Sequence, residues 1–301
     1  MPRIGVGCAA LSILSAATDD DAAVAMLVRA FERGVRYFDV APLYGGGRGE
    51  VLLGRALRRM DGAVAVSTKV GYFGAIPYGG RQAPEERQKD FSRAAIERGI
   101  DESLRRLDRA SVDILFLHDP AGDLDAIGRE ALPTLERLRT QGLIRAFGVG
   151  TGNVAHAAAM LDRFAVDCLL LAGRWTPIDR TGERIVERCA QNGVQLVVGG
   201  IFNSGLLASD RPANGGTFDY APAPAHAIAQ AEAVGHMCVA AGVPLKAAAV
   251  RFAGRHPGVA TTLLGPRTLD ELDDLLAQFE LPIPPSLWRQ IDALDPMAAS
   301  P

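Results

Sequence analysis

The stretch GVRYFDVAPLYGGGRGEVLLGRAL (34–57) decides the fold, because it holds a buried strand, a loop and a helix in succession. Its first part, RYFDV (36–40), is apolar on both faces, which is typical of a strand that is covered on both sides. Its second part, together with the three residues that follow it, repeats apolar residues at helical spacing. These are Leu53, Ala56, Leu57 and Met60. The stretch is therefore one βα unit of a parallel α/β protein.

Seven further apolar runs alternate with amphipathic stretches along the rest of the chain. They are IGVGC (4–8), VAVSTKV (64–70), VDILFLH (112–118), IRAFGVG (144–150), DCLLLA (167–172), VQLVVG (194–199) and VATTLLG (259–265). Eight strands that alternate with helices favour a closed (β/α)8 TIM barrel, although alternation alone also allows an open, doubly wound sheet. The chain has 301 residues and such a barrel takes about 250, so we expect a single domain over residues 1–301.

The stretches between the strands carry helix boundary signals. Asp19 to Asp21 place negative charge at the start of the first long helix, and Gly34 is suited to end it. Ser92 is a suitable N-cap for a later one. Two long segments, 71–91 and 200–225, follow strand ends. We expect them to form long loops at the C-terminal face of the strands, where barrels carry their active sites.

Composition and charge narrow the choice of partners. A net charge of −3 and an isoelectric point near 6.0 give no general attraction to nucleic acid or anionic lipid. No apolar run reaches the roughly 18 residues of a membrane span. The four cysteines show no zinc-ligand spacing, so we expect reduced, buried thiols in a cytoplasmic protein and no metal site. The segment after Arg3 resembles a signal peptide, but its Gly-Val-Gly pattern favours a first barrel strand.

Four polar residues stand where buried strands end. Asp39 interrupts its strand, Tyr44 follows five residues later, and Lys69 and His118 end theirs. Burying such groups is costly unless they pair with one another. Because the strand ends of a barrel meet at one mouth, we expect the four to converge there. Nearby, Glu50 either closes the active-site loop or begins a helix.

Lys69 is the most informative of these residues. The chain has 32 basic residues, and only Lys69, Lys89 and Lys246 are lysines. A buried lysine beside an aspartate lowers the pKa of a nearby phenol, ordinarily about 10, so that a tyrosine exchanges protons near neutral pH. Each residue alone also has a structural interpretation: an Asp39–Lys69 ion pair, an ordinary loop tyrosine at Tyr44, and a strand-end cap at His118.

The chain resembles the aldo-keto reductase family over nearly its whole length. The resemblance is carried by the opening stretch, STKVG (67–71), SLRRLDRASVDILFLHDP (103–120) and GLIRAFGVG (142–150). It implies that Tyr44 is the general acid/base, that Lys69 and Asp39 tune the pKa of Tyr44, and that His118 orients the substrate oxygen. It also implies hydride transfer between a substrate carbon and the nicotinamide C4 of NAD or NADP.

Two further stretches, AGRWTPIDR (172–180) and VVGGIFNSGLLAS (197–209), are similar to one branch of this family. The branch contains aldose 1-dehydrogenases, such as L-fucose and D-threo-aldose dehydrogenases, and pyridoxal 4-dehydrogenase. The similarity implies oxidation of an aldose, or of the cyclic hemiacetal of pyridoxal, to a lactone. The alternatives are an NADPH-dependent carbonyl reductase, a Schiff-base aldolase that uses Lys69 as its nucleophile, and a non-catalytic nicotinamide-binding protein.

The expected nicotinamide contacts depart from the commoner family pattern. The glutamine that usually holds the carboxamide falls near Ala172, so we expect Arg174 or a backbone group to replace it. The usual stacking tyrosine is matched by Gly199, so we expect the aromatic face from Phe202 or Trp175. The full set of expected cofactor contacts is Cys8, Asp39, Gly150, Thr151, Arg174, Gly200, Phe202, Asn203, Ser204, Gly205, Gly265, Arg267 and Glu271.

The segment after the last strand bears on the choice between NAD and NADP. Glu271 falls where members that bind a 2′-phosphate often carry arginine, and it lies close in sequence to Arg267. Negative charge there repels a phosphate and favours NAD, although the same charge also suits the first turn of a helix. For a small-molecule substrate we expect contacts from Tyr72, Phe73 and Trp175. We expect a monomer or a homodimer.

Overall fold

The eight predicted strands all form and close into one parallel barrel. The computed structural model describes residues 1–13, 19–73, 88–120, 122–210, 216–219 and 221–294. The barrel strands are β1 (Ile4–Gly7), β2 (Tyr37–Asp39), β3 (Ala65–Val70), β6 (Val112–His118), β7 (Ile144–Thr151), β8 (Cys168–Ala172), β9 (Gln195–Gly199) and β12 (Val259–Leu264). Their order is β1-β12-β9-β8-β7-β6-β3-β2, and β1 pairs with both β2 and β12. The predicted TIM barrel is confirmed, as is the strand interpretation of the first residues.

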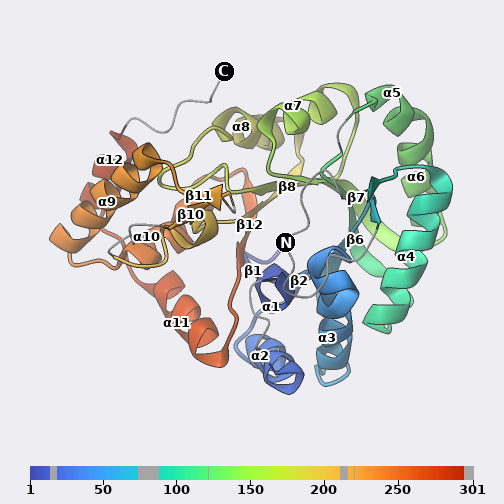
Figure 1. Cartoon of the computed structure of the whole chain (residues 1–301), viewed down its shortest axis with the longest axis horizontal. Helices are drawn as coiled ribbons and strands as arrows, with labels where there is room; N and C mark the ends of the chain where they lie inside the picture. The colour runs from blue at the N-terminus through green and yellow to red at the C-terminus, as the bar shows by residue number, and fades with distance from the viewer. Residues whose placement is uncertain (14–18, 74–87, 121, 211–215, 220, 295–301) are drawn as a thin grey trace.

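Helices surround the strands, as Figure 1 shows. They are α1 (Ala9–Ile13), α2 (Asp20–Glu32), α3 (Arg48–Leu57), α4 (Arg93–Leu107), α5 (Leu124–Ala126), α6 (Leu132–Thr140), α7 (Val154–Arg163), α8 (Glu183–Asn192), α9 (Ala225–Ala240), α10 (Leu245–Phe252), α11 (Leu269–Glu280) and α12 (Pro285–Asp292). Short helical turns are η1 (Tyr44–Gly47), η3 (Ile127–Ala131), η4 (Asn203–Gly205) and η5 (Ala253–Arg255). The predicted N-cap is present, since Ser92 accepts from the backbone N–H of Ala95. Asp19, predicted only as negative charge at the helix start, also caps α2 by accepting from the backbone N–H of Asp21.

Strand side chains point alternately into the barrel and towards the helices. The interior cluster consists of Tyr37, Ile114, Phe116, Cys168, Leu170, Val197 and Leu263, while a larger cluster fills the space between strands and helices. Asp39 lies two residues beyond Tyr37, and His118 lies two beyond Phe116. Alternation therefore continues both interior rows to the mouth, where an apolar side chain is replaced by a polar one.

The two long loops contain short antiparallel strand pairs that the sequence did not predict. β4 (Tyr72–Phe73) pairs with β5 (Gln88–Lys89), and β10 (Thr217–Phe218) pairs with β11 (Ala221–Pro222). Each follows the C-terminal end of a barrel strand, β4 after β3 and β10 after β9. The described parts of both loops thus lie at the expected face of the barrel.

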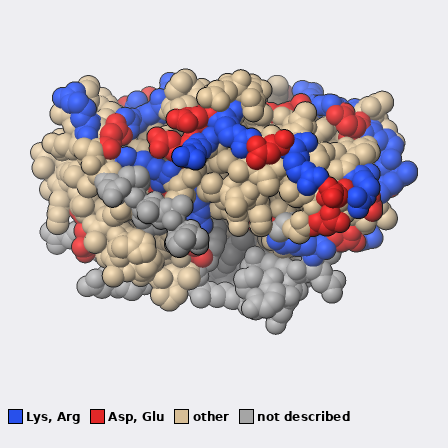
Figure 2. Space-filling model, turned by 90° about the horizontal axis from the view of Figure 1, so that it is seen from above, with Lys and Arg blue, Asp and Glu red and all other residues tan. Residues whose placement is uncertain are grey.

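The surface in Figure 2 carries interspersed basic and acidic side chains. Many of them form ion pairs, such as Arg255 with Asp292 and Arg188 with Asp162. Within the described residues, no single helix is long and apolar enough to cross a membrane. α9 and the segment Leu245–Arg255 reach that length and composition only together, with a bend of 109° between them.

Candidate active site

Asp39 and Lys69 form a buried ion pair between neighbouring strands. Lys69 Nζ lies 2.6 Å from Asp39 Oδ2, and their side chains are only 2% and 4% exposed. The ammonium also donates to the carbonyl oxygen of Val40 at 3.0 Å. Asp39 Oδ1 accepts from Ser67 Oγ at 2.6 Å, and that hydroxyl lies 2.8 Å from the hydroxyl of Tyr37. Both carboxylate oxygens are satisfied, as a buried charge requires.

This network continues a polar row into the barrel that the sequence reasoning missed. Tyr37 and Ser67 lie beneath Asp39, and burial together with the charge of Asp39 raises the pKa of Tyr37 well above its ordinary value. Its hydroxyl therefore stays protonated and available for hydrogen bonding. The alternation of interior positions, Tyr37 with Asp39 and Ser67 with Lys69, was the signal available in the sequence.

Tyr44 follows β2 on a turn made by three glycines. Gly45, Gly46 and Gly47 have φ angles of 61°, 63° and 91°, a left-handed conformation that only glycine adopts without strain. The turn leads directly into α3 and holds the Tyr44 ring beside Lys69, whose Nζ lies 5.1 Å from the ring centroid. The three glycines are therefore needed for the conformation of this turn.

His118 ends β6 within reach of two tyrosine rings. Its ring meets the Tyr44 ring edge-on at 6.1 Å and the Tyr72 ring edge-on at 5.0 Å between centroids. The Tyr72 hydroxyl donates to Asp119 Oδ2 at 3.3 Å. Lys89 donates to the carbonyl oxygen of Asp119 at 3.0 Å and lies 4.9 Å above the Tyr72 ring. The strand pair β4–β5 is therefore fastened over the end of β6.

The structure brings the four predicted residues together on adjacent strands. Asp39 and Tyr44 come from β2 and its loop, Lys69 from β3 and His118 from β6, and β2, β3 and β6 are neighbours in the barrel. Most of the expected cofactor residues lie on the next strands around the barrel, in β7 and in the loops after β8, β9 and β12. Cys8 and Asp39 are the exceptions, since Cys8 follows β1 and Asp39 lies in β2 with the proton-transfer groups.

Among the cofactor candidates, Arg174 links three loops. Its guanidinium donates to the carbonyl oxygen of Gly152 at 2.8 Å and to the buried Asp179 at 2.9 Å, and it also pairs with Asp219. Hydrogen bonds to the two carboxylates raise its pKa, although burial lowers it. Its donors are thus already directed at protein acceptors, which makes Arg174 better suited to shape the loops than to hold a carboxamide.

Asn203 is better placed to meet a nicotinamide carboxamide. Its side chain is 2% exposed, and its Nδ2 donates to the carbonyl oxygen of Gly173 at 3.0 Å. The Oδ1 atom is buried without a hydrogen-bond partner among the described residues. Such an acceptor is costly unless a ligand donates to it. Gly200 packs tightly on Gly173, where an added Cβ would lie 2.8 Å from the backbone nitrogen. These loop ends therefore fit a nicotinamide cofactor.

The remaining candidates after the strand ends differ in exposure. Ser204 and Gly205 are exposed in η4, Phe202 is half-buried against the core, and Thr151 is buried at the end of β7 beside Gly150. Cys8 is fully buried, and its backbone N–H donates to the carbonyl oxygen of Asp39 at 2.8 Å. Burial, together with the charge of Asp39, raises the pKa of the Cys8 thiol, so it stays neutral.

The start of α11 holds an Arg267–Glu271 ion pair. Arg267 Nε lies 3.0 Å from Glu271 Oε1, and the backbone N–H of Arg267 donates to Oε2 at 2.8 Å. The hydrogen bonds from Arg267 hold the pKa of Glu271 below its ordinary value. Thr268 caps the helix by accepting from the backbone N–H of Glu271. Gly265, also exposed, precedes this turn.

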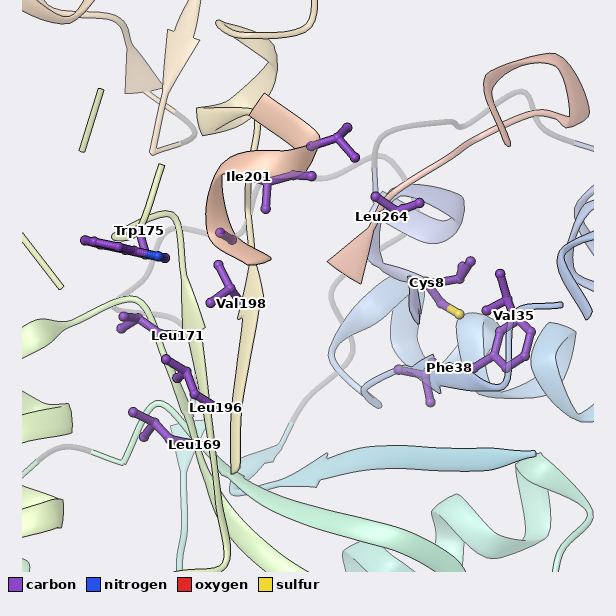
Figure 3. Packing of buried hydrophobic residues seen from close by; sticks show 14 of the residues in the cluster. Cys8, Val35, Phe38, Leu169, Leu171, Trp175, Leu196, Val198, Ile201 and Leu264 are labelled. Atoms are coloured by element: carbon purple, nitrogen blue, oxygen red, sulfur yellow. The ribbon is translucent and has the colours of Figure 1, made fainter. Parts of the chain in front are cut away.

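The structure corrects the expectation for Trp175. Its indole is 7% exposed and packs against Phe252 at 5.3 Å and His256 at 6.0 Å, in the core between strands and helices. Figure 3 shows it on the same side as Leu169 and Leu171, away from the barrel interior. Trp175 is therefore a core residue. The Phe73 side chain lies outside the described residues, which leaves Tyr72 as the substrate-contact candidate at the mouth.

The four cysteines are buried and none of them forms a disulfide, as predicted. Burial raises the pKa of Cys189 to about 11 and that of Cys168 and Cys238 to about 12. Among the described residues, no group of three or more His, Cys, Asp or Glu side chains is arranged to hold a metal ion.

Comparison with known proteins agrees with this fold. The chain is 35% identical to a pyridoxal 4-dehydrogenase of Microbacterium luteolum, covering 96% of this chain and 92% of the relative. It is 32% identical to a D-threo-aldose 1-dehydrogenase of a Pseudomonas species, covering 97% and 93%. An aldo-keto reductase structure from Bacillus halodurans, in its holo form, superposes with a TM-score of 0.79 at 25% identity, covering 96% and 91%. The profile of the Aldo/keto reductase family matches residues 3–296. The chain therefore belongs to the aldo/keto reductase family of oxidoreductases.

Proposed function

We propose that this protein oxidises a cyclic hemiacetal, an aldose or pyridoxal, to a lactone with NAD as the hydride acceptor. The observation that carries the proposal is the buried Asp39–Lys69 pair beside Tyr44. A fixed positive charge 5.1 Å from the ring centroid stabilises tyrosinate. Oxidation needs such a base, because the hydroxyl proton must leave as the carbon loses its hydride.

The residues divide the reaction between them. Aldo-keto reductases use a nicotinamide cofactor, which supplies the hydride acceptor when it is bound. Lys69 stabilises the tyrosinate form of Tyr44, whose oxygen takes the proton from the hemiacetal hydroxyl and so becomes a neutral phenol. His118 lies beside Tyr44 and orients the substrate oxygen, while Tyr72 forms a wall of the pocket. In the reduction of a carbonyl the reaction is reversed, and Tyr44 donates the proton instead of accepting it.

The preference for NAD is supported by the Arg267–Glu271 pair. The Arg267 guanidinium is already neutralised by Glu271, and a 2′-phosphate would have to displace that carboxylate. The adenosine hydroxyl groups of NAD would instead find Glu271 as an acceptor. The alternative is an NADPH-dependent carbonyl reductase. In that case Arg267 would have to leave Glu271 easily in order to bind the 2′-phosphate.

Pyridoxal is the second candidate substrate, since the matched relatives include both a pyridoxal and an aldose dehydrogenase. A Schiff-base aldolase is disfavoured by the geometry of Lys69. Its nitrogen donates to Asp39 and to the carbonyl oxygen of Val40, so these hydrogen bonds hold it against the protein and away from a substrate carbonyl.

The test is a screen for cofactor reduction with aldoses and pyridoxal, with NAD and NADP in parallel. We expect turnover with NAD and a hemiacetal substrate, and its loss in the Tyr44→Phe variant, which retains the ring but lacks the acidic hydroxyl. Full activity in Tyr44→Phe would refute the mechanism. Borohydride trapping of a substrate on Lys69 would replace it with the aldolase chemistry.

A further inference from the structure

A second buried ion pair lies behind the loop that carries Tyr44. Glu50 in α3 is completely buried, and its Oε2 lies 2.5 Å from Nε of Arg106 in α4. Its Oε1 accepts a hydrogen bond of 2.6 Å from Oγ1 of Thr68, which is also completely buried. One carboxylate therefore joins α3, α4 and β3.

The joined segments are those that hold the proposed catalytic pair. Thr68 immediately precedes Lys69 in β3. Glu50 lies in the first turn of α3, six residues after Tyr44 and just beyond the three-glycine turn. The Glu50 carboxylate is thus a short link between the backbone that carries Tyr44 and the backbone that carries Lys69.

Arg106 also packs on the glycine turn itself. A Cβ added to Gly47 would lie 2.7 Å from Cδ and 2.8 Å from Nε of Arg106, so the arginine side chain lies directly against this backbone. Three glycines in succession restrict the chain very little by themselves. The turn therefore takes its position from the groups that contact it.

A cavity borders the same turn and leaves it partly unsupported. It has a volume of about 170 Å³, and its walls include Leu43 and Gly46 from the Tyr44 loop and Gly99 and Arg106 from α4. The cavity is partly open to solvent and is also lined by Lys69 and Tyr72, so the loop has room to shift towards α4 if its anchor is lost. The Glu50–Arg106 pair is placed to prevent that shift.

We propose that Glu50 and Arg106 are positioning residues that fix Tyr44 relative to Lys69. This inference rests on the proposed function, because the two residues act through Tyr44 and touch neither the substrate nor the cofactor. Loss of the link displaces Tyr44 from the charge that stabilises tyrosinate. It therefore alters the proton-transfer step and leaves cofactor binding intact.

The test compares Arg106→Met, Arg106→Lys and Thr68→Val with the unchanged protein. A displacement of about 1 Å at a reacting group costs up to about 100-fold in rate, so we expect kcat in Arg106→Met to fall about 10- to 100-fold. We expect KM for NAD to stay constant and the pH–rate profile to move towards higher pH. Arg106→Lys restores part of the rate, because it keeps the charge. Thr68→Val, nearly isosteric, gives a smaller change of the same kind.

A matched control is available in another ion pair that involves α4. Arg137 of the neighbouring α6 pairs with Glu97 of α4 at 2.6 Å, and their side chains are 31% and 36% exposed. Arg137→Met removes an ion pair to α4 without touching the Tyr44 loop. We expect its kcat and pH profile to match those of the unchanged protein, even where its thermal stability falls.

The outcomes separate this inference from the proposed function. Folded Arg106→Met and Thr68→Val variants with unchanged kcat and pH profile overturn the positioning role, while inactive Tyr44→Phe leaves the mechanism in place. If Arg106→Met does not fold, Thr68→Val decides alone, since it removes no charge. An active Tyr44→Phe variant would overturn the proposed function itself.

Discussion

Replacing Lys69 with methionine removes the charge that supports Tyr44, and the size of its effect follows from the structure. The ammonium nitrogen lies 5.1 Å from the Tyr44 ring centroid, and the Lys69 side chain is only 2% exposed. With an effective dielectric constant of ~20, one charge at that distance stabilises tyrosinate by ~3 kcal/mol. We therefore expect about two orders of magnitude less tyrosinate at a given pH in Lys69→Met.

The assay is the rate of cofactor reduction between about pH 6 and 10. In Lys69→Met we expect a fall of about 100-fold near neutral pH, and a partial return of activity as rising pH forms tyrosinate without help. KM for NAD should change little, because Lys69 is buried beneath the mouth. The unchanged protein should show the same rise about two pH units lower.

Folding needs its own control in this experiment. Removal of Lys69 leaves Asp39 buried with Ser67 as its remaining side-chain donor, and breaking such a pair destabilises a fold by about 3–5 kcal/mol. Urea unfolding of each variant measures this loss. Lys246→Met, which breaks a half-exposed pair with Asp274, serves as the matched lysine variant. A folded Lys69→Met protein whose rate and pH profile match those of the unchanged enzyme would refute the electrostatic role.

Three further predictions concern other parts of the chain. Glu271→Gln frees Arg267, so the NADP-to-NAD ratio of kcat/KM should rise about tenfold, and an unchanged ratio contradicts the assigned role. Hydrogen bonding to Arg255 holds the pKa of Asp292 below its ordinary value, so this pair stabilises the fold above the unfolded carboxyl pKa and its contribution is lost as pH falls. Asp292→Asn should therefore lower Tm by more at about pH 7 than at about pH 3, and equal shifts at both values argue against the pair. The four cysteines should react with iodoacetamide only after unfolding, and rapid labelling of the native protein would contradict their burial.

The barrel was readable from the sequence because each strand is apolar on both faces and because helices α2 and α4 carry boundary signals. Asp19 and Ser92 cap helices where the sequence placed them. The pairs β4–β5 and β10–β11 were not readable, since two-residue strands have no periodicity. Met60 continues the spacing of Leu53 and Leu57 but lies beyond the end of α3 at Leu57. Spacing alone does not show where a helix stops.

The catalytic candidates were found because lysine is rare in the chain and because polar residues interrupt apolar strands. The prediction for Trp175 was wrong, because an aromatic residue after a strand can lie either at the barrel mouth or in the outer core. The path of the loop determines which of the two it occupies. The link from Glu50 to Arg106 joins residues 56 positions apart, with nothing in the local sequence to announce it. Such pairings depend on how α3 and α4 pack together.

The separation of the two sets of residues around the barrel has a consequence for redesign. Because β2, β3 and β6 form one continuous arc, and β7, β8, β9 and β12 form the next, the arc that carries most of the proposed cofactor contacts is a separate block of strands. A chimaera that takes residues 144–280 from a relative would join at the β6–β7 and β1–β12 seams and leave the arc with Tyr44 and Lys69 untouched. Most of the proposed cofactor contacts and the proposed proton-transfer groups thus lie on separate segments of the chain, so one set can be varied without rebuilding the other.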